Sequence, residues 1–495
     1  MNESIEQIDP NQQLSIETVK KRAVGGALIL TFRTFFIQTI SFFSSALLTV
    51  FLEPSQFGVF FIVSAVVNFL SYFGDIGLAA ALIQKKEKLT DLELRTIFTI
   101  QQSLVILLVL FVIIATPTLT TIYKFNQQSI YLLWALAFSL FLSSLKTIPS
   151  VMMERKLEFN KLVIPQIVET VLFNTVAVYL AWKGFGITSF AIAVLIRGIS
   201  GLIVTYILQP WKMGFSFSKP AMLPLLKFGI PYQTNTFLAM VKDDGMTLFL
   251  GTILGSSGVG LLGWAQKWAY APLRFFMDQV IKVTFPAFAR LQDNKQELSK
   301  ASSKAIFFVC LLVFPSLVLL ILVVPTLTEV IPKYEKWQPA LLALSLISIT
   351  SALAAITTPL TNMFNAIGKI SITFKLMIMF TTLTWVFVPV GAIVYGVNGA
   401  ALGFSAVGLS SIIALIIARR YITIDYFQVA GKPFLGATVT GFAVLFTGNF
   451  LSTSIAKVIA MIASGIVSYT AVIIILEPTI ITQIKTMLKM KQHNV

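Results

Sequence analysis

Residues 305–325 read AIFFVCLLVFPSLVLLILVVP, a run without a charged side chain. An α-helix rises about 1.5 Å per residue, so about 20 apolar residues cross the hydrocarbon layer of a bilayer, which is roughly 30 Å thick. Lipid is the solvent that suits every side chain of such a run. This stretch therefore predicts a transmembrane helix.

Similar apolar runs recur along the whole chain. Of the 495 residues, 56% are hydrophobic and 12% are charged, whereas soluble domains carry about 25% charged residues. A membrane β-barrel would show alternation over segments of about 10 residues, which is not present. We predict an all-α integral membrane protein with about 14 transmembrane helices, at residues 24–52, 57–83, 94–115, 130–150, 162–182, 187–209, 226–253, 258–285, 303–325, 339–363, 371–393, 397–418, 433–451 and 455–476.

The rare residue types exclude several kinds of site. Cys310 is the only cysteine and His493 the only histidine, so we expect no internal disulfide, no multi-cysteine metal site, no histidine relay and no cofactor. The amino-terminal residues are polar and acidic until Lys20, unlike a cleaved secretion signal. Residues 1–23 are therefore expected to form a cytoplasmic tail.

The basic residues determine the expected orientation. With the amino terminus inside, the inner segments carry 21 Lys and Arg residues and the outer loops only four. Cytoplasmic loops of membrane proteins are enriched in these residues. Both termini are thus predicted to be cytoplasmic, and the net charge of +16 requires no nucleic acid as a partner.

Two pairs of similar short segments indicate an internal repeat. Residues 52–58 (LEPSQFG) and 254–260 (LGSSGVG) lie 202 positions apart, and the turns at Gly186 and Gly399 lie 213 apart. Repeats of this kind build many transporters, with the substrate path between the halves. The expected divisions are a six-helix bundle at 24–209, a cytoplasmic connector at 210–225, a second six-helix bundle at 226–420, two further helices within 421–476 and a cytoplasmic tail at 477–495.

Charged residues fall inside the first six predicted helices. Ionisable groups at membrane depth cost at least about 2.5 kcal/mol each on insertion scales, so they usually mark a function. Arg33 and Asp75 lie at similar distances from the inner ends of their helices. We expect them to pair across the first hairpin, either as a packing device or in a cavity. Glu169 and Arg197 lie in the fifth and sixth predicted helices.

The seventh and eighth predicted helices carry more charges. The first has three in sequence, Lys242, Asp243 and Asp244. The second has Lys267, Arg274, Asp278 and Lys282, which lie within about 80° of arc on a helix. Lys282 is close enough to the inner end to reach the interface, and Asn68 and Asn235 would extend the polar faces. This pattern predicts a hydrated cavity.

An excess of cations within apolar walls suits an anion, and arginine suits phosphate. The candidate substrate-cavity residues are Arg33, Arg197, Lys242, Lys267 and Arg274. The candidates for coupling to H⁺ or Na⁺ are Asp75, Asp243, Asp244 and Asp278, because burial and neighbouring charges shift the protonation of carboxylates.

Several segments resemble those of bacterial polysaccharide flippases. They are FGDIGL at 73–78 with QKKE at 84–87, ERKLEFNK at 154–161, FPAFARLQD at 285–293 and YEKWQPA at 334–340. We interpret 154–161 as a solvated helix end and 285–293 as the exit of a long helix. As a set, the segments resemble the colanic-acid and teichuronic-acid exporter branch of the multidrug/oligosaccharidyl-lipid/polysaccharide superfamily.

The resemblance implies two six-helix bundles around a V-shaped central cavity, alternating access, and export of oligosaccharide repeat units linked to undecaprenyl diphosphate. It also implies a location in a bacterial inner membrane, membrane lipid and a lipid-linked oligosaccharide as partners, and contact with polysaccharide polymerase and export machinery. Only Asp75, among the candidate residues, falls within a matched segment.

Two other functions are to be weighed against export of oligosaccharide. A multidrug or cation efflux antiporter of the same superfamily would share the fold but would have a more acidic and apolar pocket. A membrane enzyme that polymerises polysaccharide or transfers sugars is disfavoured, because the longest outer loops span about 14 residues (116–129 and 326–338) and contain no constellation of catalytic groups.

Overall fold

The computed structural model describes residues 16–85 and 87–478, within which every regular element is a helix. Lys86, His493 and most of the two expected tails lie outside the described residues, as do the side chains of 16–25, 27, 28, 228 and 230–236, including that of Asn235. Twelve helices are long and apolar enough to cross a membrane. The chain is a multi-pass helical membrane protein, as predicted.

Two of these candidate spans are unusually long, and each contains a break. One covers Phe237–Leu291 and the other Ile370–Ala418. Gly255 (φ 65°) interrupts the first and Gly396 (φ 60°) the second, at the turns expected from sequence. Glycine adopts these positive φ values without the steric penalty that a Cβ would bring. The number of 14 transmembrane helices remains a prediction, since it requires both halves of each broken helix to cross separately.

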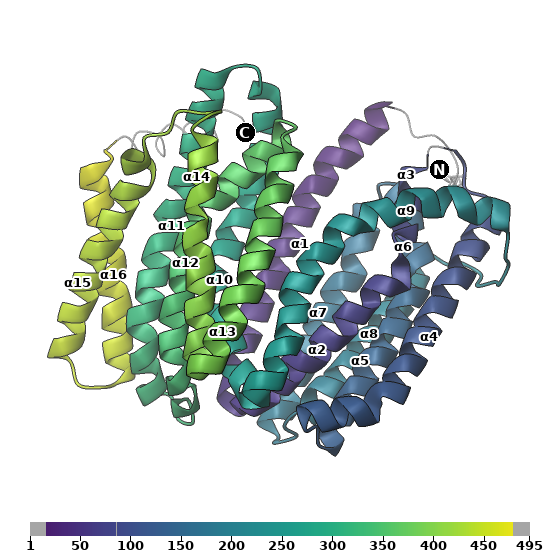
Figure 1. The fold of residues 1–495 in the computed structure, drawn as a ribbon, viewed down its shortest axis with the longest axis horizontal. Coiled ribbons are helices and arrows are strands. Elements are labelled where there is room, and N and C mark those ends of the chain that lie inside the picture. Colours follow the sequence, from purple (N-terminus) through teal and green to yellow (C-terminus); the bar gives the residue numbers. More distant parts are fainter. Residues whose placement is uncertain (1–15, 86, 479–495) are drawn as a thin grey trace, which may run out of the picture. The chain divides into compact units, whose positions relative to one another are not determined.

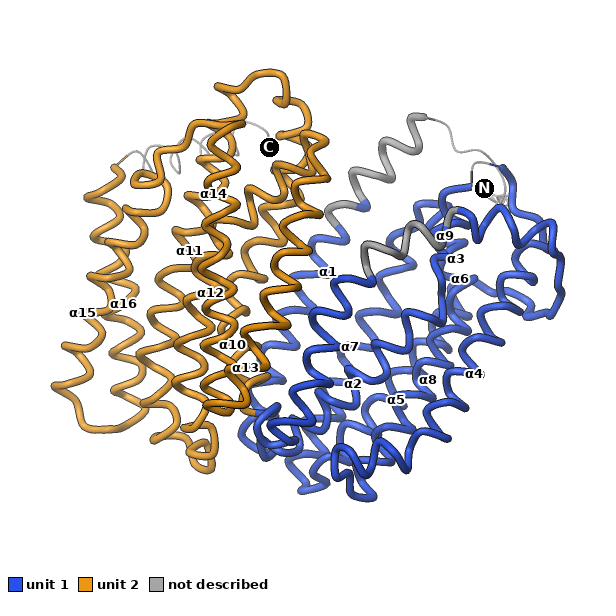
Figure 2. The backbone as a smooth tube through the Cα atoms, viewed as in Figure 1, with its two compact units in different colours: residues 1–260 blue, residues 261–495 orange. Residues whose placement is uncertain are grey.

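The chain forms two compact units, residues 1–260 and 261–495 (Figure 2). The sequence repeat instead predicts that the second six-helix bundle begins at residue 226, and this division remains a prediction. The elements up to the boundary are α1 (Ile16–Phe51), α2 (Pro54–Asp75), α3 (Leu78–Gln84), α4 (Asp91–Tyr123), α5 (Gln127–Leu145), α6 (Thr147–Arg155), α7 (Phe159–Trp182), α8 (Thr188–Leu208), α9 (Lys219–Met240) and the π-helix η1 (Val241–Gly245). Helix α10 (Met246–Leu291) crosses the boundary.

Within the first unit, helices distant in sequence pack together (Figure 1). Helix α1 packs against α7 and α7 against α8, while α5 packs against α8, α2 and α4. The predicted helix at 57–83 is interrupted, because Ile76 and Gly77 adopt left-handed conformations between α2 and α3. Asp75, directly before this break, accepts a hydrogen bond from the backbone N–H of Ala79 (3.2 Å).

The two repeated turns contact each other reciprocally. A Cβ on Gly58 would lie 1.6 Å from the carbonyl oxygen of Ser256, and one on Gly260 would lie 1.8 Å from that of Pro54. Pro54 and Ser256 are 202 positions apart, as are Gly58 and Gly260. Each turn therefore presents its glycine to the other's backbone, the arrangement expected of elements related by a twofold axis.

The second unit is built around α11. Its elements after α10 are α11 (Lys295–Val330), the 3-10 helix η2 (Glu335–Ala340), α12 (Leu341–Ala366), α13 (Ile370–Ser410), α14 (Ile412–Ala418), the π-helix η3 (Phe427–Gly431), α15 (Lys432–Phe450) and α16 (Ile455–Leu476). Helix α11 packs against α12, α15 and α16, and α15 and α16 lie side by side at its flank (Figure 1).

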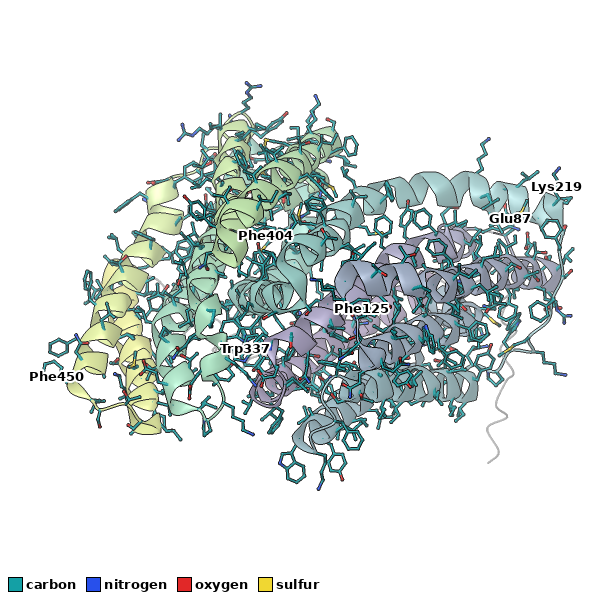
Figure 3. All side chains as sticks on the ribbon, turned by 60° about the horizontal axis from the view of Figure 1, so that its bottom comes forward. Glu87, Phe125, Lys219, Trp337, Phe404 and Phe450 are labelled. Atoms are coloured by element: carbon teal, nitrogen blue, oxygen red, sulfur yellow. The ribbon has the colours of Figure 1, made fainter. Side chains whose placement is uncertain are left out.

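Aromatic side chains differ in burial across the second unit (Figure 3). Trp337 in η2 is fully buried and stacks on Trp264 of α10, with ring centroids 5.1 Å apart. Phe450 projects from the end of α15 and is 72% exposed. The stacked pair holds the 334–340 segment against α10, whereas the exposed ring suits a lipid environment.

Candidate functional site

A group of charged side chains in the first unit gathers around α7. Gln166 and Glu169 lie one turn apart on this helix, so their side chains share one side of it. Arg33 reaches them from α1, Arg197 from α8, and Lys146 from the junction between α5 and α6. We call these five residues, Arg33, Lys146, Gln166, Glu169 and Arg197, the α7 charge cluster.

Glu169 bridges two cations. Its Oε1 pairs with Nζ of Lys146, and its Oε2 lies 3.7 Å from Nε of Arg197. The side chains of Glu169 and Lys146 are 11% and 15% exposed, whereas that of Arg197 is 53% exposed and lies over the ring of Phe173. Lys146 is thus held inside the bundle, and Arg197 keeps an open side.

The position of Lys146 is set by the backbone around it. It is the C-cap of α5 and the N-cap of α6, with its N–H bonded to the carbonyl oxygen of Ser143 (3.1 Å). The hydroxyl of Tyr206, on α8, donates to the preceding carbonyl, that of Leu145 (3.0 Å). These bonds fix the point from which the lysine side chain reaches α7.

Glycine makes room for the shared carboxylate. Gly201 lies one turn after Arg197 on α8, and a Cβ there would come within 1.7 Å of Oε1 of Glu169. The carboxylate therefore rests directly over the α8 backbone. Any larger residue at 201 would displace the end of the Glu169 side chain.

Arg33 does not form the expected pair with Asp75. Its Nη1 donates to Oε1 of Gln166 (2.5 Å) and its Nη2 to Thr34 (3.3 Å), while its Nε is buried without a hydrogen-bond partner. The hypothesis of a salt bridge across the first hairpin is wrong, because α1 packs along α7 rather than beside α2. Asp75 instead bonds to the backbone at the start of α3.

The consecutive charges 242–244 form part of the π-helix η1, in which one turn is wider than in an α-helix. Lys242 pairs with the neighbouring Asp243 (3.1 Å), and the carboxylate of Asp244 accepts a hydrogen bond from the side-chain amide of Asn68 on α2. Asp243 remains 70% exposed. The Lys242–Asp243 pair and Asp244 thus have different surroundings, and Asn68 adds a polar contact from α2.

The charges of α10 lie on one continuous helical run after Gly255, so their expected stripe is compatible with the structure. Lys267, Arg274 and Lys282 are exposed and Asp278 is intermediate. Trp264, Trp268 and Met277 are buried on the same stretch of helix. No cluster of three or more His, Cys, Asp or Glu side chains suited to a metal ion occurs in residues 16–85 and 87–478.

Arg155 connects the segments 84–87 and 154–161. Arg155, the last residue of α6, donates to the carbonyl oxygens of Leu82 (2.5 Å), Lys85 (2.6 Å) and Glu87 (3.0 Å). Its guanidinium caps the carboxyl end of α3, where carbonyls have no helical partner. The interpretation of 154–161 as a simple solvated helix end was therefore incomplete.

Sequence reasoning missed Lys146, Gln166 and Gly201. Lys146 lies near the inner end of a predicted span, where a lysine ordinarily reaches the interface. Gln166 carries no charge, and Gly201 is one of 28 glycines. One signal was available: Glu169, an acid at membrane depth, needs a cation within reach, and Lys146 and Arg197 lie on the two helices that neighbour it in sequence.

The chain is similar to one protein family and to several individual proteins. The model of a family described as "Polysaccharide biosynthesis protein" matches residues 47–342. The lipopolysaccharide biosynthesis protein WzxC of Escherichia coli (strain K12) is 24% identical over 430 residues, covering 85% of this chain and 83% of WzxC. The succinoglycan biosynthesis transport protein ExoT of Rhizobium meliloti (strain 1021) is 21% identical over 486 residues, covering 95% and 96%.

Among solved structures, the lipid II flippase MurJ in its inward closed conformation superposes with a TM-score of 0.74. The two chains are 16% identical, and the match covers 92% of this chain and all of that one. At this identity the likeness establishes a shared fold.

Proposed function

Because the chain belongs to the polysaccharide biosynthesis protein family, we propose that it flips an undecaprenyl-diphosphate-linked oligosaccharide from the cytoplasmic to the outer leaflet for surface polysaccharide export. The names of the relatives WzxC and ExoT, which refer to lipopolysaccharide and succinoglycan biosynthesis, support this assignment. The observation that carries it is the family match over residues 47–342, in a chain whose apolar helices hold clustered cations.

The chemistry of the clusters suits the headgroup. The α7 charge cluster has three cations and one anion, a formal charge of +2. A diphosphate is the part of the substrate that such a site would recognise, since arginine and lysine form charge-assisted hydrogen bonds with phosphate oxygens. We assign substrate contact to Arg33, Arg197, Lys242, Lys267 and Arg274.

A polar path through the protein lowers the energetic cost of moving the headgroup across the membrane. Sugar hydroxyls and phosphates cannot enter hydrocarbon without losing their hydrogen bonds to water. The proposed transporter exposes its charged side chains alternately to the two sides of the membrane, while the prenyl chain stays in lipid. Its helices carry out no covalent chemistry.

The driving ion is a separate part of the proposal. We assign coupling to H⁺ or Na⁺ to the carboxylates Asp75, Asp243, Asp244 and Asp278. Transport by reconstituted protein should then respond to a pH gradient, a sodium gradient or the membrane potential. A flipping rate that is indifferent to all three would remove this assignment.

The proposed location is a bacterial inner membrane, with both termini cytoplasmic. The partners are membrane lipid and the lipid-linked oligosaccharide, with polysaccharide polymerase and export machinery on the outer side. The distribution of basic residues along the chain supports the orientation of the termini, and the bacterial relatives WzxC and ExoT support the membrane and the substrate.

The test uses a bacterial strain that needs this gene for surface polysaccharide. We expect Arg33→Ala and Arg274→Ala to reduce polymer strongly, while Lys183→Ala, an exposed residue between α7 and α8, leaves it unchanged. Protein amounts in the membrane serve as the control for expression. Normal polymer from both arginine variants would count against the function.

Cation efflux is the second candidate and has weaker support. A site for cationic compounds needs uncompensated carboxylates, whereas in the α7 charge cluster the single carboxylate already bridges two cations. Uptake of a cationic dye into inverted vesicles, driven by a proton gradient, would favour efflux and overturn the flippase assignment.

A further inference from the structure

The shared carboxylate of the α7 charge cluster has a geometry that a phosphate could reproduce. Glu169 presents one oxygen to Lys146 and the other to Arg197. Two adjacent phosphate oxygens can bridge a pair of cations in the same way. Glu169 thus occupies a position that an incoming anion would compete for.

The two cations are not equally available. Lys146 is largely buried and its backbone is fixed by bonds from α5 and α8. Arg197 is half exposed, and its 3.7 Å separation from Glu169 exceeds hydrogen-bond length. An anion approaching from the open side would therefore meet Arg197 first, while Lys146 could retain the carboxylate.

The carboxylate also has an electrostatic role when no substrate is bound. Several cations without counter-ions inside an apolar bundle are strongly unfavourable. After releasing its substrate, an alternating-access transporter must change conformation again without a bound anion. A fixed internal anion reduces the net charge that the empty protein would otherwise hold in the membrane.

We propose that Glu169 is an exchangeable counter-ion: it neutralises Arg197 in the empty transporter and yields that arginine to a phosphate of the substrate. Arg197 then binds the phosphate, and Lys146 and Gly201 act as positioning residues that hold the carboxylate beside it. This inference rests on the proposed function, because it specifies how the diphosphate is admitted.

The first test measures binding of undecaprenyl diphosphate to the purified full chain in nanodiscs of neutral phosphatidylcholine. Removing the competing charge with Glu169→Gln should tighten binding about fivefold, within the range of couplings between contacting residues. Arg197→Gln should weaken binding, and adding Glu169→Gln to it should restore nothing. Glu329→Gln, an exposed acid at the end of α11, is the charge-matched control.

A second variant keeps every charge. Gly201→Ala places a methyl group against Oε1 of Glu169 and must displace the carboxylate, so it should tighten binding in the same direction. Gly198→Ala on the same helix meets Leu142 instead, at 2.9 Å, and should leave the affinity unchanged. This pair keeps the proposal testable should Glu169→Gln fold poorly.

Turnover separates a counter-ion from a purely structural ion pair. Glu169→Gln should bind more tightly and yet flip a fluorescent lipid-linked oligosaccharide more slowly in proteoliposomes, because its empty form returns with unneutralised cations. Unchanged affinity in both Glu169→Gln and Gly201→Ala, with only a lower thermal midpoint, would overturn the proposal.

Two further outcomes separate a failure of the counter-ion proposal from a failure of the proposed function or of the substrate assignment. If the wild-type chain does not bind undecaprenyl diphosphate at all, the proposed function fails. If Glu169→Gln equally strengthens binding of phosphatidylglycerol added to the nanodiscs, the site recognises any lipid phosphate, and the assignment to the substrate is wrong.

Discussion

At the residue scale, Arg155 and Arg197 show how the groups that an arginine contacts determine whether it stabilises the fold or can bind a ligand. Arg155 donates to three backbone carbonyls and closes the end of a helix. Arg197 has one carboxylate at 3.7 Å and an open face. The first is satisfied by the protein itself, so it stabilises the fold. The second has binding capacity left for a ligand.

Arg155→Ala should therefore lower the stability of the protein, with a smaller effect on the transport rate of the folded protein. It removes three hydrogen bonds from a charged donor, and a loss of about 2 kcal/mol is expected for a partly exposed group. Arg155→Lys keeps the charge but cannot form the fork of bonds, so its thermal unfolding midpoint should fall between those of the alanine variant and the wild type. Equal midpoints for all three proteins would contradict the capping role. Arg290→Ala, which changes an exposed arginine, is the control and should leave the midpoint unchanged.

The neighbouring Glu154 makes a pH-dependent contribution. Burial raises the pKa of its carboxyl above the ordinary value of 4.5. Its protonated form is thus favoured in the folded state, and the associated stability is present below pH 4.5 and lost as pH rises through the folded pKa. Glu154→Gln should raise the unfolding midpoint at pH 8 and match the wild type near pH 4. A gain of the same size at both values would exclude titration as the cause.

At the element scale, helix breaks and close approaches depend on a few glycines. The break at Gly255 separates α10 into two runs directly before the turn that meets Gly58. The reciprocal contact of the two turns leaves no room for a side chain on either. Backbone atoms cannot yield as the end of a side chain can.

Gly58→Ala and Gly260→Ala should therefore have similar effects, because each forces the same two turns apart. We expect each to lower the unfolding midpoint and the export of polysaccharide, and the double variant to be less than additive, since one contact is lost only once. Gly441→Ala, whose new methyl group would meet neighbours at ordinary distances from 3.4 Å, is the control. Fully additive effects would show that the turns act independently.

At the scale of the whole molecule, orientation is open to direct measurement. Cys310 is buried, and replacing it by alanine gives a background without thiols. In that background, a membrane-impermeant maleimide should label Lys183→Cys in intact cells but Lys88→Cys only after permeabilisation, because the basic inner segments stay in the cytoplasm. The opposite labelling would reverse the predicted topology.

The expected fold class followed from physics that is local in the sequence. Apolar length sets which segments can enter a bilayer, and glycine and proline mark where they turn, so the helical membrane fold and the breaks near Gly255 and Gly396 could be predicted. The resemblance of short motifs such as 334–340 correctly indicated the family, which the match over 47–342 confirms.

The partners of the buried charges were decided by tertiary structure alone. The sequence showed that Arg33 and Glu169 needed partners, but it did not show that α1 lies along α7 or that Lys146 reaches Glu169 over Gly201. Membrane insertion depends on each segment's own side chains, whereas an ion pair depends on which helices become neighbours. That choice arises from the packing of many surfaces at once, and no single stretch of sequence contains it.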